Sequence, residues 1–487
     1  MGEEVTRGPR VAVIGGGISG LAAAWFLRAE LGESAQITVF DKAPRVGGHL
    51  RVSEVAGVPV DEGAESLLAR RPEAVDLVRA VGLGEDIVTP AQVGARLWSR
   101  GRMVAMPAGT VMGVPRDVSA LAGLLDPDEL AVARSADQQA GMPIDGDVAI
   151  GAFVAARLGP AVVERLVDPL LGGVYAGQAS ALSLDATVPA LGAAAREHAS
   201  LHAAVAAVQA AGSGADTAAG GNGGATTVGP VFAGVRGGVG RLPEAVATAS
   251  GAVIETGATV RDLRRTASGW QLVTGPVPAP QVFTADAVVV AVPAAPAARL
   301  LGEAVPAAAA ELGAIETASM AIVTLAVPAE AFPEPPTSSG YLVPPVDGRT
   351  VKAVTYSSVK WPWLGERAGA SVLLRASIGR VGEVADLQRD DDELVAVVID
   401  ELAAASGLSA SPVDARVTRW GGALPQYAVG HLDRVRRIRA AVEAVPGLAV
   451  CGAVYDGVGV AACVAAAAKA ARRVAADVSE GRVRIGA

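Results

Sequence analysis

Short apolar runs and helical patterns alternate at both ends of the chain. Val11–Ile14 and Ile37–Phe40 are typical of buried strands, and Ile18–Glu30 between them is typical of a helix. Strand, glycine-rich turn, helix and strand in this order predict the opening of a parallel α/β unit. Leu448–Cys451 predicts another strand, and the stretch from Gly457 to about Val478 predicts a long helix. We therefore expect one α/β domain that is built from both chain ends.

The middle of the chain lacks this rhythm. Its pattern predicts a largely helical region from Ala91 to Ala210, whereas the low-complexity residues 211–227 predict a flexible surface loop. Strands over Val253–Val260 and Ala287–Val292 resume the α/β pattern. The expected fold class is α/β: a Rossmann-like dinucleotide domain with an inserted, mixed α+β domain and a helical region. The expected boundaries are 1–90, 231–296 and 420–487 for the dinucleotide domain, 91–230 for the helical region and 297–419 for the mixed sheet.

Composition excludes several classes of protein. The 487 residues are 51% hydrophobic and 19% charged, which excludes a disordered chain. Lys and Arg number 41 against 50 Asp and Glu, and the net charge of −9 argues against a nucleic-acid partner. The two cysteines, Cys451 and Cys463, lie in an apolar stretch and exclude a disulfide scaffold and a four-cysteine zinc site. We expect both to be buried and reduced, as in a cytoplasmic protein.

Two apolar stretches resemble targeting or membrane segments without fitting either. The first residues carry acids and enter a glycine motif, so we expect no cleaved signal peptide. The stretch from Leu448 to Ala468 is nearly long enough to span a bilayer, but it contains Asp456 and is mostly alanine. A strand followed by a buried helix explains it better. We therefore expect a soluble chain, with peripheral membrane contact left open.

A dinucleotide fingerprint follows the first strand. In Gly15-Gly16-Gly17-Ile18-Ser19-Gly20, the first, third and sixth residues occupy the glycine positions of a GxGxxG motif. They allow the tight turn, the approach of backbone amides to a pyrophosphate, and close helix–sheet packing. The phosphates then meet the positive end of a helix dipole. Asp41 ends the second strand, 21 residues after Gly20, where its carboxylate is placed to accept bonds from the adenosine ribose.

The residues after Asp41 favour FAD over NAD. Lys42 and Arg45 supply positive charge, and Gly47 and Gly48 let this loop close on the cofactor. No second GxGxxG follows a strand, so no separate NAD(P)H domain is expected. The C-terminal segment contains Gly452, Gly457, Val458, Gly459 and Val460 at another strand-to-helix turn, where a helix N-terminus favours the negative charge of reduced flavin.

Several longer stretches resemble the FAD-containing protoporphyrinogen and coproporphyrinogen III oxidase family, particularly its bacterial coproporphyrin-forming branch. They include DEGAESLLARRPEA, LLGGVYAGQASALSLDATVPAL, FAGVRGGVGRLPEAV and RWGGALPQYAVGHL. The resemblance implies a p-hydroxybenzoate hydroxylase-like FAD fold. The FAD contacts that it implies are Gly15–Gly20, Asp41, Lys42, Gly63, Ala64, Glu65, Ser66, Val260, Trp420 and Val458–Val460. His49 stands where a longer basic residue is common in the family, and residues 211–227 have no evident family counterpart.

The resemblance also implies a porphyrinogen substrate. Such a large, greasy macrocycle with carboxylates needs an apolar site with a few fixed cations. Arg71 matches a basic position associated with propionate contact, Arg70 precedes it, and Gly173 lies in a glycine-containing stretch that allows close approach of the macrocycle. The implied reaction removes six electrons from coproporphyrinogen III in heme biosynthesis, in three rounds of flavin reduction, with O2 as acceptor and H2O2 as product.

Flavin N5 accepts the hydride in this reaction, so we nominate no catalytic side chain and no metal site. Peripheral membrane contact and contact with a downstream ferrochelatase stay open. Three other functions remain as alternatives: a protoporphyrinogen IX oxidase, a flavin amine oxidase or carotenoid desaturase on the same scaffold, and a catalytically silent binding protein resembling the prenyl-protein dissociation inhibitors.

Overall fold

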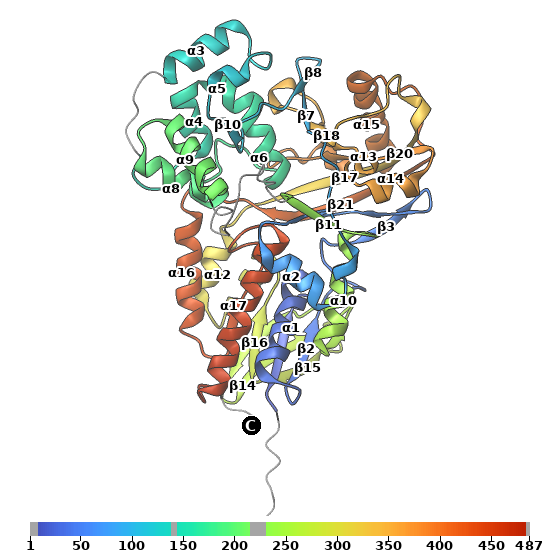
Figure 1. Cartoon of the computed structure of the whole chain (residues 1–487). Coiled ribbons are helices and arrows are strands. Elements are labelled where there is room, and N and C mark those ends of the chain that lie inside the picture. Colours follow the sequence, from blue (N-terminus) through green and yellow to red (C-terminus); the bar gives the residue numbers. More distant parts are fainter. Residues whose placement is uncertain (1–7, 138–143, 215–229, 484–487) are drawn as a thin grey trace, which may run out of the picture.

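A five-stranded parallel sheet forms the base of the molecule (Figure 1). The computed structural model describes residues 8–137, 144–214 and 230–483. Every neighbouring pair in this sheet is parallel, and the strand order places β1 at the centre. The order is β12 (Val253–Glu255), β2 (Gln36–Phe40), β1 (Arg10–Ile14), β16 (Ala287–Val290) and β22 (Leu448–Val450). The prediction that both chain ends build one α/β domain is confirmed.

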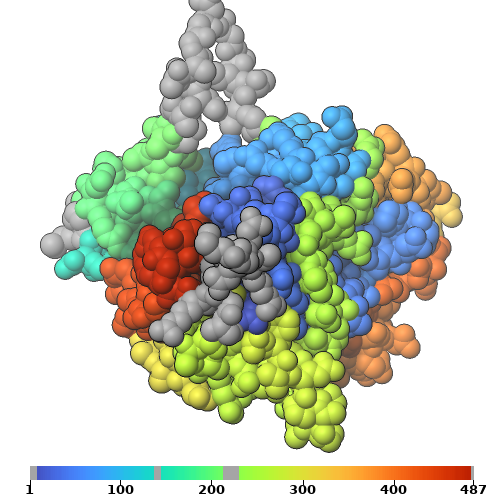
Figure 2. Space-filling model, turned by 90° about the horizontal axis from the view of Figure 1, so that it is seen from below, coloured from blue at the N-terminus to red at the C-terminus, as the bar shows by residue number. Residues whose placement is uncertain are grey.

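Side chains alternate between the two faces of this sheet, so each face has its own core. Val11 and Val13 point to one face and Ala12 and Ile14 to the other. The first face is covered by α1 (Ile18–Leu31), α2 (Pro72–Ala80), α10 (Leu242–Ser250) and α17 (Val460–Ser479). The second is covered by β13 (Asp262–Thr266), β14 (Gly269–Thr274), β15 (Gln281–Ala285), α11 (Ala294–Leu301), α12 (Pro306–Gly313) and α16 (His431–Glu443). Figure 2 shows the blue N-terminal, red C-terminal and yellow-green central segments meeting on the underside of this layer.

A second, seven-stranded sheet lies above the first layer (Figure 1). Its strands are antiparallel except for the parallel pair β18–β7. Their order is β21 (Asp414–Pro425), β17 (Thr317–Pro328), β20 (Ser371–Ile378), β19 (Val351–Thr355), β18 (Gly340–Leu342), β7 (Arg96–Ser99) and β8 (Arg102–Ala105). Helix α15 (Asp391–Ser406) packs on one face through Leu394, Val398 and Leu402. This is the expected mixed domain.

The region from Ala91 to Ala210 is only partly the helical region that we expected. Its helices form a separate core on the left of Figure 1, but it begins with β7 and β8, which complete the seven-stranded sheet. These two strands have four residues each and adjoin a helix-rich segment. Four residues are too few to show the alternation of apolar and polar positions that identifies a strand in a sequence. The helices are α3 (Pro127–Asp137), α4 (Ile150–Leu158), α5 (Pro160–Val162), α6 (Asp168–Tyr175), α7 (Leu184–Thr187), α8 (Pro189–Glu197) and α9 (Leu201–Gly214), with a π-helical turn over Val163–Val167.

Four other expectations about elements need correction. The strand predicted over Val253–Val260 ends at Glu255, because Gly257 turns the chain with a φ of +65°. The C-terminal helix begins at Val460 rather than Gly457. The expected loop over 211–227 starts inside α9, which continues to Gly214, while residues 215–227 lie outside the described residues. The boundary between residues 419 and 420 falls within β21, and α11 and α12 at the start of the 297–419 segment pack on the nucleotide sheet.

Three smaller pairs of elements connect these layers. A hairpin of β3 (Val52–Val55) and β4 (Val58–Asp61) leads into β5 (Leu67–Leu68), which pairs with β11 (Phe232–Val235). The short helices α13 (Ser357–Lys360) and α14 (Pro362–Ala368) pack beside the hairpin through Trp361 and Trp363. Within the described ranges, no helix is both long and apolar enough to span a bilayer.

Candidate functional site

The fingerprint glycines form a tight turn between β1 and α1. The N–H of Gly15 donates to the carbonyl of Phe40 at 2.8 Å, and Gly15 has a φ of +114°, which disfavours any side chain. A Cβ on Gly20 would lie 1.8 Å from the Gly15 carbonyl oxygen. Gly17 is the N-cap of α1, so the N–H groups of Ile18, Ser19 and Gly20 have no acceptor within the helix. These are the groups that bind phosphate at a helix N-terminus.

The second glycine pair packs directly on the first turn. Gly47 donates its N–H to the Gly16 carbonyl at 2.7 Å, and the backbones of Gly17 and Gly47 form a parallel bridge. A Cβ on Gly48 would lie 3.3 Å from Gly17 Cα. Arg45 donates to the Val46 carbonyl at 3.0 Å, so its guanidinium lies along its own loop. This loop therefore packs on the fingerprint turn, while its closure on the cofactor stays a prediction.

Asp41 lies at the carboxyl end of β2 beside the fingerprint. One carboxylate oxygen accepts the Gly16 N–H at 2.6 Å and the other accepts the Ala43 N–H at 2.7 Å. Each oxygen keeps a lone pair for a further donor, such as a ribose hydroxyl. Lys42 is exposed next to it. The Asp41 carbonyl accepts the N–H of Ala258, which brings the segment before Val260 to the same edge of the sheet.

The C-terminal turn reaches this edge from the other end of the chain. Cys451 Sγ lies 3.8 Å from the Ser19 carbonyl oxygen, and a Cβ on Gly452 would lie 3.9 Å from Ser19 Oγ. Gly459 is the N-cap of α17, which packs against α1. Val458 is half-buried against the helical region. The N-termini of α1 and α17 therefore both lie at the carboxyl edge of the parallel sheet, where open α/β folds bind their ligands.

The loop over Gly63-Ala64-Glu65-Ser66 adjoins the glycine loops through His49. A Cβ on Gly63 would lie 1.8 Å from the His49 carbonyl oxygen, and the His49 ring meets Trp420 edge-on at 5.2 Å between centroids. Trp420 donates from Nε1 to the Glu62 carbonyl at 2.8 Å. The structure thus brings the loop and Trp420 together, as the resemblance implied. The Glu65 carboxylate, however, is bound to residues of the upper sheet domain.

The three residues proposed for the substrate belong to two elements, the start of α2 and helix α6. Arg71 is the N-cap of α2, half-exposed, and forms an ion pair with Glu73 at 3.0 Å. The hydrogen bond that Arg71 donates to the Glu73 carboxylate raises the pKa of Arg71, and the charge of Asp456 in the C-terminal turn adds to the shift. Arg70 is exposed. Gly173 lies in α6, where a Cβ would be 3.5 Å from Leu342 of β18.

The family-specific stretches GGVYAG and ALPQY pack on one another. Gln426 donates from Nε2 to the Tyr175 carbonyl at 2.8 Å, and a Cβ on Gly177 would lie 2.4 Å from Gln426 Oε1. Tyr427 donates its hydroxyl to the Ala453 carbonyl, which ties this packing to the C-terminal turn. His431 stacks on the Tyr427 ring at 4.1 Å between centroids. These residues therefore connect the helical region to the flavin side of the molecule.

His431 predicts a loss of stability in mild acid. Burial lowers its pKa to about 4, against about 6.5 in an unfolded chain. Its contribution is present above pH 6.5 and is lost as the pH falls toward 4, because only the unfolded chain then gains the proton. We expect about 2 kcal/mol of this loss between pH 7.5 and pH 5, and His431→Phe should remove it. Urea unfolding at both pH values measures the difference. His198→Phe, at the end of α8, is the control, and equal pH dependence in His431→Phe and the wild type would contradict the prediction.

The donor set fits a bound FAD. The N-terminus of α1 suits the anionic pyrophosphate, that of α17 suits the negative charge of reduced flavin, and the Asp41 carboxylate suits a ribose. The close approach of the two glycine loops leaves backbone rather than side chains at this edge. Two histidines of the helical region, His198 and His202, lie outside this set. His198 ends α8 and His202 lies on α9, where its Nδ1 is 2.5 Å from the Arg116 carbonyl oxygen, so the two do not share one helix.

The fold and this site are those of an FAD-dependent oxidoreductase. A family model described as flavin containing amine oxidoreductase matches residues 18–475. A coproporphyrinogen III oxidase of Mycobacterium tuberculosis is 40% identical over 478 residues, which cover 95% of this chain and 96% of that protein. The chain belongs to the flavin-containing amine oxidoreductase family, and FAD is its cofactor.

Solved structures agree with this assignment. The crystal structure named "Putative protoporphyrinogen oxidase from Exiguobacterium sp. 255-15" has a TM-score of 0.83 and 28% identity, and the match covers 96% of this chain and 99% of that one. Cyclohexylamine oxidase from Brevibacterium oxydans has a TM-score of 0.69 and 18% identity, covering 97% and 100%, and shares the fold. The expected α/β FAD-binding fold with an inserted sheet domain is confirmed.

Sequence reasoning missed the charged residues that hold the flavin-side loops. Asp61 is buried and accepts the N–H groups of Val239 and Gly240 at 2.9 and 2.8 Å. Burial raises the pKa of Asp61 to about 7. Arg375 and Lys360 bind Glu65. Arg375 is the one charged residue within the apolar run of β20. A charge in a buried strand needs a partner, so this arginine could have indicated from the sequence that an acidic residue lies against it.

Proposed function

We propose that this protein oxidises coproporphyrinogen III to coproporphyrin III in heme biosynthesis. The observation that carries the proposal is the 40% identity, over almost the whole of both chains, to enzymes of that name. Arg71 supports it, because a cation that is half-exposed beside the C-terminal turn suits a macrocycle with propionates. Within this proposal Arg70 is a second cation for the carboxylates, and Gly173 allows the macrocycle to approach α6.

In this reaction the chain's own residues bind and orient the cofactor and the substrate, and they exclude water. FAD, when bound, supplies the chemistry by accepting a hydride at N5 from a carbon that bridges two rings. The cofactor contacts that we propose are Gly15, Gly16, Gly17, Ile18, Ser19, Gly20, Asp41, Lys42, Arg45, Gly47, Gly48, Gly63, Ala64, Glu65, Ser66, Val260, Trp420, Gly452, Gly457, Val458, Gly459 and Val460. The contact of Glu65 is through its backbone, because its carboxylate is bound by Lys360 and Arg375. No side chain is proposed as a catalytic acid or base.

Anaerobic flavin bleaching tests the substrate directly. The purified protein is mixed without oxygen with coproporphyrinogen III or with protoporphyrinogen IX, and the loss of flavin absorbance is followed. We expect at least tenfold faster bleaching by coproporphyrinogen III, whose extra carboxylates use the fixed cations. Equal rates, or faster bleaching by protoporphyrinogen IX, would exclude the proposed substrate in favour of the second porphyrinogen.

Arg71→Ala is expected to raise the KM for coproporphyrinogen III tenfold or more, with a smaller change in kcat. The removed interaction is a charged hydrogen bond, worth about 1.5–3 kcal/mol. Arg79→Ala on the same helix α2 is the matched control, since Arg79 is also ion-paired and 61% exposed, with Asp76 as its partner. Steady-state kinetics compare the two variants. A KM that rises equally in both, or in neither, would contradict a substrate role for Arg71.

Oxygen is the electron acceptor that we propose. Six electrons leave the substrate in three flavin cycles, so three O2 are consumed and three H2O2 formed for each coproporphyrin. An oxygen electrode with and without catalase measures this ratio. We also propose a cytoplasmic location, which the two buried free cysteines support, and leave peripheral membrane contact and ferrochelatase contact open.

A further inference from the structure

One arginine of the upper sheet holds both the backbone and a side chain of the flavin-side loop. Arg375, on β20, donates from Nη2 to the Gly63 carbonyl at 2.5 Å and from Nη1 to Glu65 Oε2 at 3.0 Å. Arg375 and Glu65 lie 310 residues apart in the sequence. A guanidinium presents its donors in a rigid fork, so two bonds from one side chain fix the relative position of their acceptors. The loop geometry at Gly63–Ser66 therefore depends on β20.

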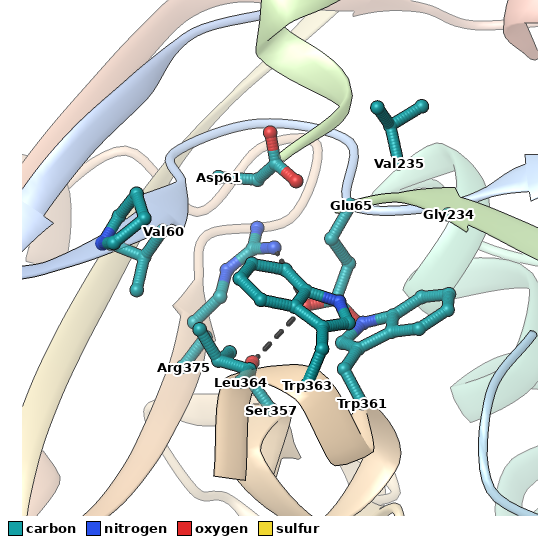
Figure 3. Close-up of a pocket in the computed structure, with 11 residues that line it drawn as sticks. Val60, Asp61, Glu65, Gly234, Val235, Ser357, Trp361, Trp363, Leu364 and Arg375 are labelled. Carbon is teal, nitrogen blue, oxygen red and sulfur yellow. Dashed lines mark hydrogen bonds and ion pairs between the residues drawn. The ribbon is translucent and has the colours of Figure 1, made fainter. Parts of the chain in front are cut away.

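The Glu65 carboxylate completes the attachment from a third element. Lys360 Nζ lies 2.7 Å from Glu65 Oε1, and the Ser357 hydroxyl donates to Oε2 at 3.1 Å; both residues belong to α13. Figure 3 shows the Glu65 side chain running from the loop toward Ser357, beside Trp361 and Trp363. Burial alone would raise the pKa of Glu65, but Lys360 and Arg375 outweigh it and lower the pKa to about 2. The carboxylate is therefore ionised at neutral pH.

The residue before the loop is held from the same sheet. Trp420 donates to the Glu62 carbonyl, and Arg416 forms an ion pair with the Glu62 carboxylate at 2.6 Å; both lie on β21. Two strands and one short helix of the upper domain thus hold three of the four residues from Glu62 to Glu65, namely Glu62, Gly63 and Glu65. A buried ion pair adds little net stability compared with apolar packing. The contribution of these ion pairs is therefore to fix the position of the loop rather than to stabilise the fold.

We propose that Arg375, Glu65 and Lys360 form a positioning cluster that fixes the Gly63–Ser66 loop in its flavin-binding conformation, so that the upper sheet domain sets the affinity for FAD. The cluster acts through the loop backbone and touches neither substrate nor reacting atoms. This inference rests on the proposed contact between the loop and FAD, and it is independent of which porphyrinogen is oxidised.

Dissociation of FAD from the purified holoenzyme tests the cluster. The dissociation constant is measured from the flavin fluorescence released on dilution, and the visible flavin spectrum is recorded before dilution. Arg375→Gln is expected to raise the dissociation constant tenfold or more and to alter the shape of the visible band. Arg375→Lys, which keeps a charge for Glu65 but loses the fork to Gly63, should fall between Arg375→Gln and the wild type. Glu65→Gln should also weaken FAD binding. If Arg375→Gln does not fold, Glu65→Gln and Arg375→Lys together test the cluster.

Arg165→Gln is the matched control. Arg165 is 11% exposed and forms an ion pair at 3.1 Å with Asp347, whereas Arg375 is 10% exposed and its ion pair with Glu65 is 3.0 Å long. The control should lower the melting temperature to a similar extent and leave the FAD dissociation constant unchanged. The inference is overturned by wild-type FAD affinity in Arg375→Gln, or by an equal loss in Arg165→Gln. Failure of the proposed substrate is a separate result, since it leaves these FAD measurements as they stand.

Discussion

Purified Gly20→Ala protein is expected to be colourless, with an affinity for FAD at least 100-fold below that of the wild type. The added Cβ would lie 1.8 Å from the Gly15 carbonyl oxygen and 3.2 Å from Val13 Cγ1. Both neighbours belong to β1 or its turn, which cannot move because Gly15 is bound to the carbonyl of Phe40. Helix α1 must therefore shift outward, and its N–H groups lose their approach to the pyrophosphate.

Flavin absorbance per mole of purified protein measures this effect, and titration with added FAD gives the affinity. The matched control is Gly94→Ala, because a Cβ on Gly94 meets no atom within 4 Å. That variant should remain yellow and bind FAD as the wild type does. Gly20→Ala protein that retains a full complement of FAD would contradict the assignment of this turn as the pyrophosphate site.

Glu62→Gln is expected to lower the free energy of unfolding by about 1–3 kcal/mol. The Glu62 carboxylate is 1% exposed and lies between Arg51 at 3.1 Å and Arg416 at 2.6 Å. Removing its charge leaves two arginines without their anion between the β3–β4 hairpin and β21. Water reaches both arginines, which are more than a third exposed, and offsets part of the cost of breaking a buried ion pair. A fully exposed pair contributes about 1 kcal/mol or less.

Urea denaturation followed by circular dichroism measures this loss. Glu54→Gln on the same hairpin is the control, because Glu54 is exposed, and we expect it to change the unfolding free energy by less than about 0.5 kcal/mol. Similar unfolding curves for the two variants would mean that Glu62 contributes no more than a surface carboxylate.

The dinucleotide half of the site could be predicted because its signals are local. The β1–α1–β2 unit follows from a short apolar run, three spaced glycines and one acid within about 30 residues, and each element formed close to its expected bounds. The C-terminal turn was found for the same reason, with an error of three residues at the start of α17 because Gly457 and Gly459 both fit a helix start.

The upper domain was harder to predict because its pairings are remote in sequence. Strand β7 pairs in parallel with β18, so Leu97 lies beside Leu342, and nothing near residue 97 indicates that partner. The partners of Glu65 are remote in sequence as well. The resemblance placed Glu65 at the cofactor, and nothing near residue 65 indicates that its carboxylate is directed to Arg375 and Lys360. Side-chain direction in a loop depends on the partners that the fold supplies, and single-sequence patterns carry no record of them.

The central place of β1 has a consequence for how the protein is made. Its neighbour β16 and the covering helix α17 are synthesised about 275 and 450 residues after β1. At roughly 15 residues per second, the nascent N-terminus waits about half a minute for its last partner. The nucleotide domain therefore completes its folding only after α17 has been synthesised, and until then the apolar faces of β1 and α1 lack the residues that bury them.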